Sequence, residues 1–341
     1  MDLNAVVTPA RQILELLKSH VEGDDDRFRT AALQLAANEA RQGHDDIAQE
    51  IKRLAEQSQQ PLRLEDRTQA VNSVPFFRPQ GELAGLLEMV QPSVGLNQLI
   101  LSPALEVRLR RVVKEQQQFG RLREHGLRPR QRLLLLGPPG CGKTMTAHAL
   151  AHELGLPLFI LRLDALFTKF LGETAAKLRQ VFDAVEQHRA VFLFDEFDSL
   201  GLARGAQHDV AEMRRVLNSF LVFIDNMRGH SLVVAASNHP EALDPALFRR
   251  FDDIIEYAMP TRAEVAKVFH QRLASEDCAS VDWPQVLRSA GKLSFAEAVR
   301  IADDAAKERI IEHQPRITTD LLLRSIADRV KARPRGKKPR T

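Results

Sequence analysis

The chain has 341 residues, 44% of them hydrophobic and 27% charged, and a formal net charge of +3. That length allows two or three compact units, and the composition is ordinary for a globular protein. The two cysteines, Cys141 and Cys278, are too few for a disulfide framework and lack the spacing of a zinc site, so those two protein classes are excluded. With no signal-peptide pattern at the start and no apolar run near the ~20 residues that span a bilayer, we expect a cytoplasmic protein that does not enter membranes.

Residues 1–60 predict a small N-terminal helical module. Three stretches repeat the spacing of an amphipathic helix, with apolar faces formed by Ile13, Leu16, Leu17 and Val21, by Phe28, Ala32, Leu35 and Ala36, and by Ile47, Ile51 and Leu54. Residues 60–80 contain three prolines and no sustained periodicity, and we interpret residues 61–94 as a linker. The helical pattern fits either a module that binds a partner protein or an element of assembly.

Short β-rich runs alternate with helical stretches between about residue 95 and residue 260. The runs cover residues 132–136, 158–161, 191–194, 232–236 and 254–257, and a helix-length stretch follows each of the first four. This alternation predicts an α/β domain with a five-stranded parallel sheet. After Pro260 the strands stop, and helical patterns over residues 261–332 predict a C-terminal helical lid.

A basic tail, residues 333–341, ends the sequence. The last eleven residues carry six positive charges and no negative one, whereas the rest of the chain is mildly acidic. This distribution does not describe a DNA-binding domain, and most such tails are simply solvated. Contact with nucleic acid or with an acidic partner through the tail is the alternative.

The strongest chemical signal is the run Gly137-Pro138-Pro139-Gly140-Cys141-Gly142-Lys143-Thr144, which matches the phosphate-loop pattern GxxxxGK[ST]. An apolar strand precedes this run and an amphipathic helix follows it, which is the context that such a loop needs. Glycines let the backbone curl so that its N–H groups surround phosphates at the helix N-terminus. We expect residues 137–145, which include Met145, to bind ATP, with Lys143 at the β- and γ-phosphates and the Thr144 hydroxyl on Mg²⁺.

An acidic pair ends the third predicted strand, about fifty residues after the phosphate loop. Asp195 and Glu196 follow the continuous apolar run of residues 191–194, which is typical of a buried parallel strand. The carboxyl ends of such strands face the ligand crevice. We therefore expect Asp195 to hold Mg²⁺ and Glu196 to orient and polarise the water that attacks the nucleotide.

Three further segments follow in a characteristic order. A loop with Lys169, Phe170 and Leu171 comes after the second strand, Asn238 ends the fourth, and the run 243–252 contains Arg249 and Arg250. Together with the phosphate loop and the acidic pair, they resemble the AAA family of ATPases over about residues 95–325. The resemblance implies a P-loop α/β domain with a helical lid, ATP and Mg²⁺ as cofactors, and a ring of subunits, a hexamer in the family.

The same resemblance implies roles for individual residues. Asn238 is similar to the polar sensor that contacts the γ-phosphate or the attacking water. Arg249 and Arg250 are similar to the arginines that one subunit donates to its neighbour's nucleotide, where a permanent positive charge stabilises the transition state. Lys169, Phe170 and Leu171 are similar to the central-pore loop, in which an aromatic side chain grips substrate polypeptide.

The sequence departs from the family pattern in the loop and in the lid. Phe170 stands where Trp or Tyr is more common. In the lid, the run 293–298 follows the family's glycine-rich sequence only loosely, so we assign no second sensor. The chain also contains one ATPase module and not two.

The sequence therefore predicts an ATPase that converts ATP and water to ADP and phosphate and works as a chaperone-like ring. The preferred function is remodelling, unfolding or threading of a protein substrate selected by the N-terminal helices. A regulatory switch for a partner enzyme, such as a serine protease in a defence or toxin system, is the first alternative. A nucleic-acid-associated ATPase that uses the basic tail is the second.

Overall fold

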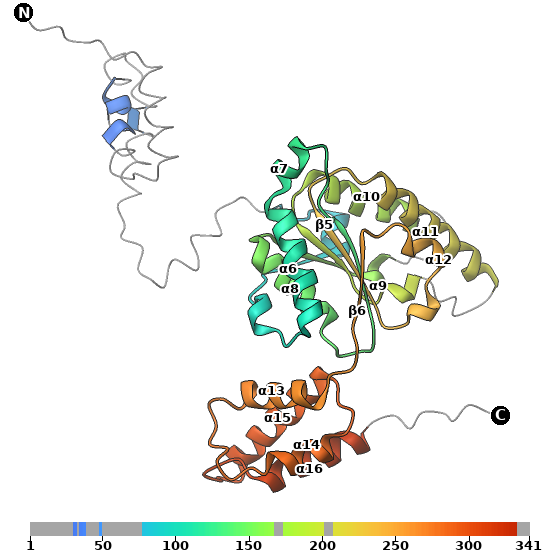
Figure 1. The fold of residues 1–341 in the computed structure, drawn as a ribbon. Coiled ribbons are helices and arrows are strands. Elements are labelled where there is room, and N and C mark those ends of the chain that lie inside the picture. The colour runs from blue at the N-terminus through green and yellow to red at the C-terminus, as the bar shows by residue number, and fades with distance from the viewer. Residues whose placement is uncertain are drawn as a thin grey trace, which may run out of the picture. The chain divides into compact units, whose positions relative to one another are not determined.

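The computed structural model describes residues 30–32, 34–38, 48–49, 77–166, 173–200 and 207–332, and the chain divides into two compact units, residues 1–76 and 77–341 (Figure 1). In the first unit the described residues are helical, and Ala31, Ala32, Ala36 and Ala48 are buried. The rest of the predicted helical module lies outside the described residues and stays a prediction.

A six-stranded sheet forms the centre of the second unit. Its strands are β1 (Leu87–Val90), β2 (Arg132–Leu136), β3 (Leu158–Leu161), β4 (Val191–Phe194), β5 (Leu232–Ser237) and β6 (Asp253–Glu256). The order is β1-β3-β4-β5-β2-β6, and all neighbours are parallel except β1 and β3. The five predicted parallel strands are confirmed, and β1 is an additional antiparallel edge strand.

Residues 82–90, which the sequence analysis assigned to a linker, form ordered structure instead. They build the short helix α5 (Glu82–Leu86) and then β1, which pairs with β3 from Leu87↔Leu161 to Val90↔Leu158. Leu86 and Leu87 are buried in the core of the sheet. The linker assignment is therefore wrong for this stretch, which belongs to the α/β domain.

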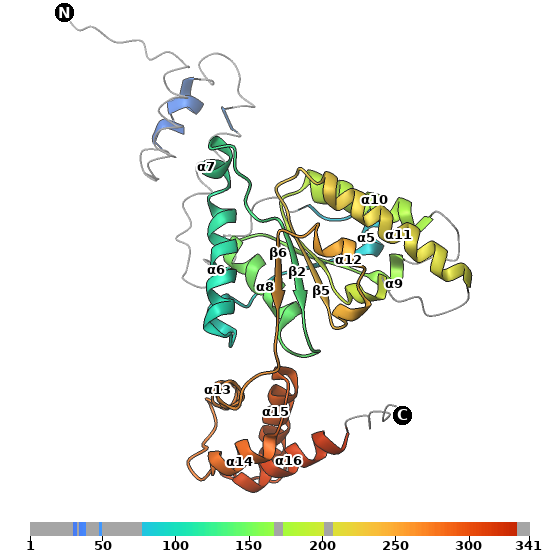
Figure 2. The ribbon, with the colours of Figure 1, turned by 45° about the vertical axis from the view of Figure 1, so that its right-hand side comes forward.

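Alternating strand residues build two separate cores, one on each face of the sheet. On one face, Leu134, Phe192 and Val233 pack with helices α10 (Glu173–Gln187) and α11 (Gln207–Asn226). On the other face, Leu133, Val191 and Val234 pack with helices α6 (Pro103–Gln117) and α8 (Lys143–Leu154). Strands covered on both faces are apolar throughout, which is why their sequences do not alternate with polar residues. Figure 2 shows the two helical layers on opposite sides of the sheet.

Short elements complete this domain. They are η1 (Leu96–Gln98), α7 (Phe119–Glu124), α9 (Leu163–Leu166), η2 (Phe197–Leu200), η3 (Pro240–Ala242) and α12 (Pro245–Phe248). None of the helices that the structure describes has the length and apolar character needed to cross a bilayer.

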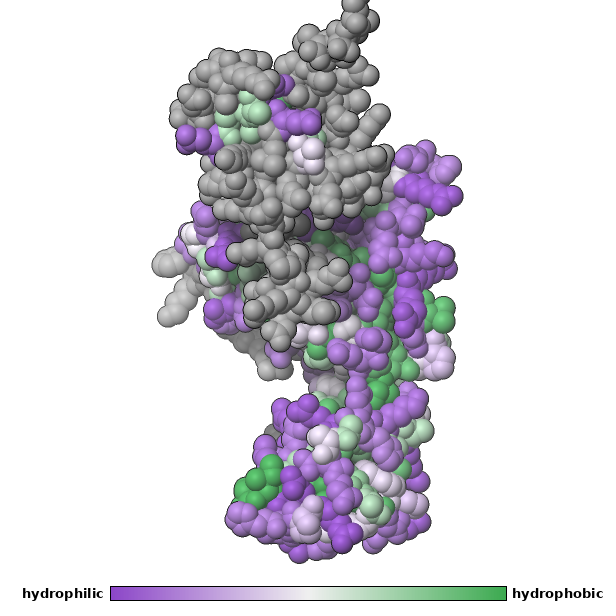
Figure 3. All heavy atoms as spheres, turned by 90° about the vertical axis from the view of Figure 1, so that its left-hand side faces the viewer, coloured by the Kyte–Doolittle hydropathy of each residue, from purple (hydrophilic) through white to green (hydrophobic). Residues whose placement is uncertain are grey.

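Four helices after β6 form the predicted C-terminal lid. They are α13 (Arg262–Arg272), α14 (Trp283–Ala290), α15 (Phe295–Ile311) and α16 (Thr319–Lys331). Thr261 and Ser294 begin α13 and α15 with capping boxes, in which each hydroxyl exchanges hydrogen bonds with a glutamate three residues on. The lid has its own core, which includes Phe269, Ile301 and Leu322. On the face seen in Figure 3, its surface is mostly hydrophilic with small hydrophobic patches.

Candidate functional site

The candidate site lies at the carboxyl ends of three neighbouring strands, β4, β5 and β2. The phosphate loop follows β2, Asp195 follows β4, and Asn238 follows β5. Because parallel strands end at the same edge of a sheet, residues about fifty positions apart in sequence meet there. The geometry brings together five of the residues selected from the sequence: Lys143, Thr144, Asp195, Glu196 and Asn238.

Two glycines of the phosphate loop allow close approach by segments far along the chain. Gly137 has φ 141° and Gly140 has φ 75°, a region that favours glycine. A Cβ on Gly137 would lie 2.3 Å from the Tyr257 carbonyl oxygen, and one on Gly140 would lie 2.8 Å from Ser294 Oγ. The loop is therefore packed between the end of β6 and the start of α15.

Lys143 is buried, and its ammonium group makes three hydrogen bonds. Nζ donates to the carbonyl oxygens of Gly137 (2.7 Å) and Pro138 (2.9 Å) and to Asn238 Oδ1 (2.7 Å). Burial lowers the pKa of Lys143, and the nearby charge of Asp195 acts in the opposite direction. A desolvated ammonium whose donors converge beside the loop is suited to phosphate oxygens, which can replace these neutral acceptors.

Thr144 and Asp195 provide a pair of oxygen donors beside the loop. Thr144 Oγ1 donates to Asp195 Oδ2 at 2.6 Å. A hydroxyl and a carboxylate are the hard ligands that Mg²⁺ takes together with nucleotide phosphates and water. The donor set fits that ion.

Glu196 differs from its neighbour in both backbone and exposure. Its φ of 49° is left-handed, which is uncommon for a residue with a side chain. Its N–H donates to Asp195 Oδ1 at 2.9 Å, and Glu196 is exposed to solvent beside the oxygen ligands of Thr144 and Asp195. Such strained positions concentrate at functional sites, and a free carboxylate there can accept a proton from water.

Asp198 is a site residue to which the sequence analysis gave no role. Its buried carboxylate accepts hydrogen bonds from Ser237 Oγ (2.9 Å) and from the N–H of Asn238 (3.2 Å). It therefore fixes the end of β5 and the backbone of Asn238, whose amide oxygen meets Lys143. Asp198 lies three residues after Asp195 in the turn that follows β4, and this spacing could have identified it from the sequence.

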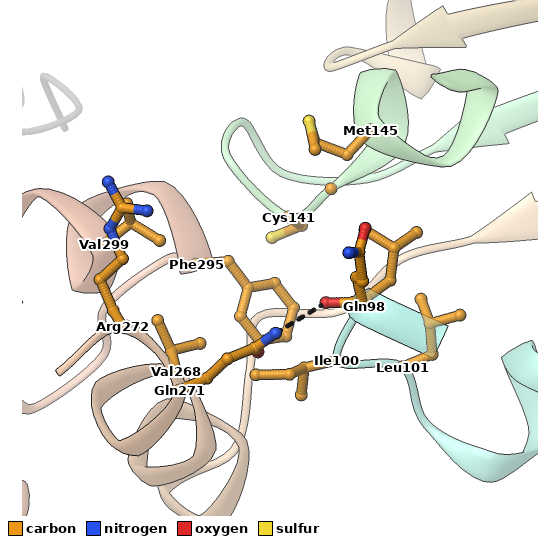
Figure 4. A pocket seen from close by; sticks show the side chains of 12 residues that line it. Gln98, Ile100, Leu101, Cys141, Met145, Val268, Gln271, Arg272, Phe295 and Val299 are labelled. Atoms are coloured by element: carbon orange, nitrogen blue, oxygen red, sulfur yellow. Dashed lines mark hydrogen bonds between the residues drawn. The ribbon is translucent and has the colours of Figure 1, made fainter. Parts of the chain in front are cut away.

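A pocket of about 450 Å³ adjoins the loop between the α/β domain and the lid; we call it the lid pocket (Figure 4). Cys141 and Met145, both predicted to contact nucleotide, line it, and the other lining residues include Ile100, Val268 and Phe295. Gln271 of α13 donates to the Gln98 carbonyl oxygen at 3.3 Å across it. The lining residues outside the phosphate loop could not be identified from the sequence, because each of them alone looks like an ordinary core or helix residue.

Comparison with known proteins identifies the family. Residues 133–259 match the model of the ATPase family associated with various cellular activities (AAA). An AAA family ATPase of Sinorhizobium fredii, y4kL, is 34% identical over 320 residues, which cover 94% of each chain. The proteasome-activating nucleotidase of Pyrococcus horikoshii is 33% identical over 216 residues, or 60% of this chain and 53% of that protein. The chain belongs to the AAA family of ATPases.

As an AAA ATPase the protein binds nucleotide and hydrolyses ATP. AAA ATPases commonly act as oligomeric rings. The α/β domain with its helical lid is the P-loop architecture that the sequence predicted.

Arg249 and Arg250, which follow α12 in this AAA ATPase, lie in different environments. Arg250 is held within the chain, since Nε donates to Asp225 Oδ2 at 3.1 Å and Nη1 to the Ala246 carbonyl oxygen at 3.1 Å. Arg249 is exposed, and within the described part of the chain its guanidinium has no hydrogen bond or ion pair. Neither arginine contacts Lys143, Thr144 or Asp195 among the described contacts.

Two predicted binding segments lie outside the described residues. The predicted pore loop, with Lys169, Phe170 and Leu171, falls between α9 and α10, and the basic tail follows α16. Both stay predictions from the sequence.

Proposed function

We propose that this AAA ATPase assembles into a hexameric ring and uses ATP hydrolysis to remodel, unfold or thread a protein substrate. The main support for a ring is the difference in environment between Arg249 and Arg250. Arg300 and Arg329 line a pocket beside Pro138–Gly140, but among the described residues no guanidinium makes a hydrogen bond or ion pair with Lys143, Thr144 or Asp195. Arg249 is exposed and has no such partner among the described residues. Phosphoryl transfer gains most from such a charge at the γ-phosphate, and a neighbouring protomer can supply it.

Each site residue has a distinct task in this proposal. The backbone N–H groups of residues 137–145 and Lys143 bind the phosphates, and Asn238 contacts the γ-phosphate or the attacking water. Thr144 and Asp195 hold Mg²⁺, which when bound supplies positive charge to the β- and γ-phosphate oxygens. Glu196 orients the water and accepts its proton. The lid pocket takes the adenine base and the ribose, because it adjoins the loop and is lined mainly by apolar side chains.

Protein remodelling is supported by two separate lines. One is the 33% identity to the proteasome-activating nucleotidase across 216 residues. The other is the run Lys169-Phe170-Leu171, which resembles a pore loop with one aromatic side chain. A ring of such side chains grips an extended polypeptide without reading its sequence, and the N-terminal helices select the substrate or partner.

The test of this proposal is Phe170→Ala, with Phe170→Tyr as the matched control. A destabilised fluorescent protein carrying an unstructured tail serves as the probe, and its loss of fluorescence is measured in the presence of ATP. We expect Phe170→Ala to slow unfolding at least tenfold while basal ATP hydrolysis changes less than twofold. Phe170→Tyr retains an aromatic ring and should keep most of the unfolding activity.

A different result would favour the alternative function. If Phe170→Ala unfolds the probe as fast as wild type, the threading proposal is wrong. If in addition a partner enzyme responds only to whether ATP or ADP is bound, the ring is a nucleotide-dependent switch.

A further inference from the structure

Tyr257 connects the phosphate loop to the lid. It directly follows β6, and the lid helix α13 begins five residues later. The Tyr257 N–H donates to the carbonyl oxygen of Leu136, the residue before the phosphate loop, at 2.7 Å. The Tyr257 carbonyl oxygen lies directly against Gly137, the first residue of the loop. One residue of the connecting segment is thus fixed to the entry of the loop.

The same side chain also reaches the helix on the far side of the loop. Tyr257 Oη donates to Thr146 Oγ1 at 2.7 Å, and Thr146 Oγ1 donates to the Gly142 carbonyl oxygen at 3.0 Å. Thr146 has no exposed surface, and Tyr257 is 6% exposed. Burial raises the pKa of the Tyr257 phenol, so the hydroxyl remains a donor at every physiological pH.

The hydrogen bonds from Tyr257 to Thr146 and from Thr146 to Gly142 fix the position of the first turn of α8. Gly142 precedes Lys143 and Thr144, and its carbonyl oxygen also accepts the N–H of Thr146 at 2.9 Å. Met259, two residues beyond Tyr257, contacts Cys141 at a sulfur–sulfur distance of 3.7 Å. The lid itself reaches the loop, because the Ala296 N–H donates to the Gly140 carbonyl oxygen at 3.1 Å.

We propose that Tyr257 is a positioning residue for ATP hydrolysis, which holds Lys143 and Thr144 through Thr146 and Gly142 and links their position to the strand leading into the lid. The proposal rests on ATP hydrolysis and not on protein remodelling. A shift of the first turn of α8 by a fraction of an ångström moves the phosphate and metal contacts away from their reactive geometry. The binding surface for nucleotide remains, so the effect falls on turnover and not on affinity.

Tyr257→Phe tests this directly, because it removes the hydroxyl and keeps the ring. We expect kcat to fall five- to tenfold while KM for ATP and the Kd for ADP change less than twofold. Thr146→Val should lower kcat by the same factor, and Thr146→Ser, which keeps the hydroxyl, should restore it. The double variant Tyr257→Phe/Thr146→Val should be no slower than either single variant, because both interrupt one path.

Ser231→Ala is the control for loss of a buried hydroxyl. Ser231 Oγ is buried at the amino end of β5, where it accepts the Ala190 N–H at 3.2 Å and donates to the His188 carbonyl oxygen. We expect Ser231→Ala and Tyr257→Phe each to lower Tm, because each removes a buried hydrogen-bonding hydroxyl, but we expect Ser231→Ala to leave kcat unchanged. The proposal is overturned if Tyr257→Phe hydrolyses ATP within twofold of wild type, or if the two single effects multiply in the double variant. Wild-type protein without ATPase activity would contradict the enzyme assignment itself, which is a different failure.

Discussion

Lys143, Asp195 and Asn238, which we propose to bind phosphate and Mg²⁺, are polar and lie near strand ends of one domain, whereas the lid pocket beside them is largely apolar and is shared between two domains. These three residues lie after β2, β4 and β5, where Lys143 donates a hydrogen bond to Asn238 and Thr144 donates one to Asp195. Val268 and Phe295 reach the lid pocket from α13 and α15. The hydrogen bonds among Lys143, Thr144, Asp195 and Asn238 therefore form within the α/β domain, whereas the lid pocket exists only where α13 and α15 meet that domain.

We therefore expect the two regions to affect different quantities, the polar site the rate of hydrolysis and the lid pocket the affinity for nucleotide. Charges and proton acceptors act on the reacting phosphate, so changes there should alter kcat. Apolar contacts with a base are equal in the ground state and the transition state, so changes in the lid pocket should alter nucleotide affinity. Variants of the two regions test whether the separation holds.

The largest effect is expected at Arg249. Arg249→Ala should lower kcat roughly a thousandfold, because an arginine at the transferring phosphoryl group contributes that order of rate. ATP affinity should change less than tenfold, since the phosphate loop remains intact. Steady-state hydrolysis and equilibrium binding of ATP measure the two quantities at concentrations where the protein is assembled.

Arg250→Ala is the comparison for that variant. Arg250 bonds to Asp225 and the Ala246 carbonyl oxygen within its own chain, so its loss should loosen α12 and lower both Tm and kcat. An Arg249→Ala protein with wild-type kcat would mean that this side chain does not serve any nucleotide.

Glu196→Gln should have the next largest effect. Removing the proton acceptor while keeping the side-chain shape should lower kcat roughly a hundredfold or more. ATP should remain bound, because Lys143, Thr144 and Asp195 are unchanged. Single-turnover hydrolysis of bound ATP checks this, and rapid loss of ATP from the variant would argue against the assignment of Glu196.

The smallest effect is expected in the lid pocket, at Phe295. Phe295→Ala should weaken ATP and ADP binding about tenfold, in line with the loss of a large apolar side chain from a ligand contact. At saturating ATP, kcat should stay within about twofold of wild type. Phe295→Leu keeps most of the apolar surface and should be intermediate in a calorimetric titration. If Phe295→Ala bound nucleotide normally but had a low kcat, the lid pocket would affect turnover as the polar site does, and the two regions would not differ in this respect.

There is a physical reason why the sequence predicted the parallel strands and the residues that gather at their carboxyl ends. Buried parallel strands such as β4 are continuous apolar runs, and the residue after each of them faces the ligand crevice. Lys143 and Asp195 could therefore be found from local patterns. The edge strand β1 was missed because four residues that pair on one side only, Leu87–Val90, leave too short a pattern to separate from a linker.

Tertiary contacts between distant segments were beyond local patterns. The lid pocket joins Gln98, Cys141 and Phe295, which no periodicity connects. The hydroxyl of Tyr257 meets Thr146 across 111 positions of sequence. Such contacts depend on how the lid returns to the phosphate loop, and only the folded chain specifies that.

In the proposed ring a complete catalytic site contains residues of two protomers, and this can be tested by mixing two inactive variants. In a ring of Arg249→Ala and Glu196→Gln protomers, some interfaces combine an intact Glu196 site with an intact Arg249 from the neighbour. We expect the mixture to hydrolyse ATP much faster than either variant alone, with maximal activity near equal amounts of the two variants. Activity that stays at the sum of the two variants at every ratio would contradict it.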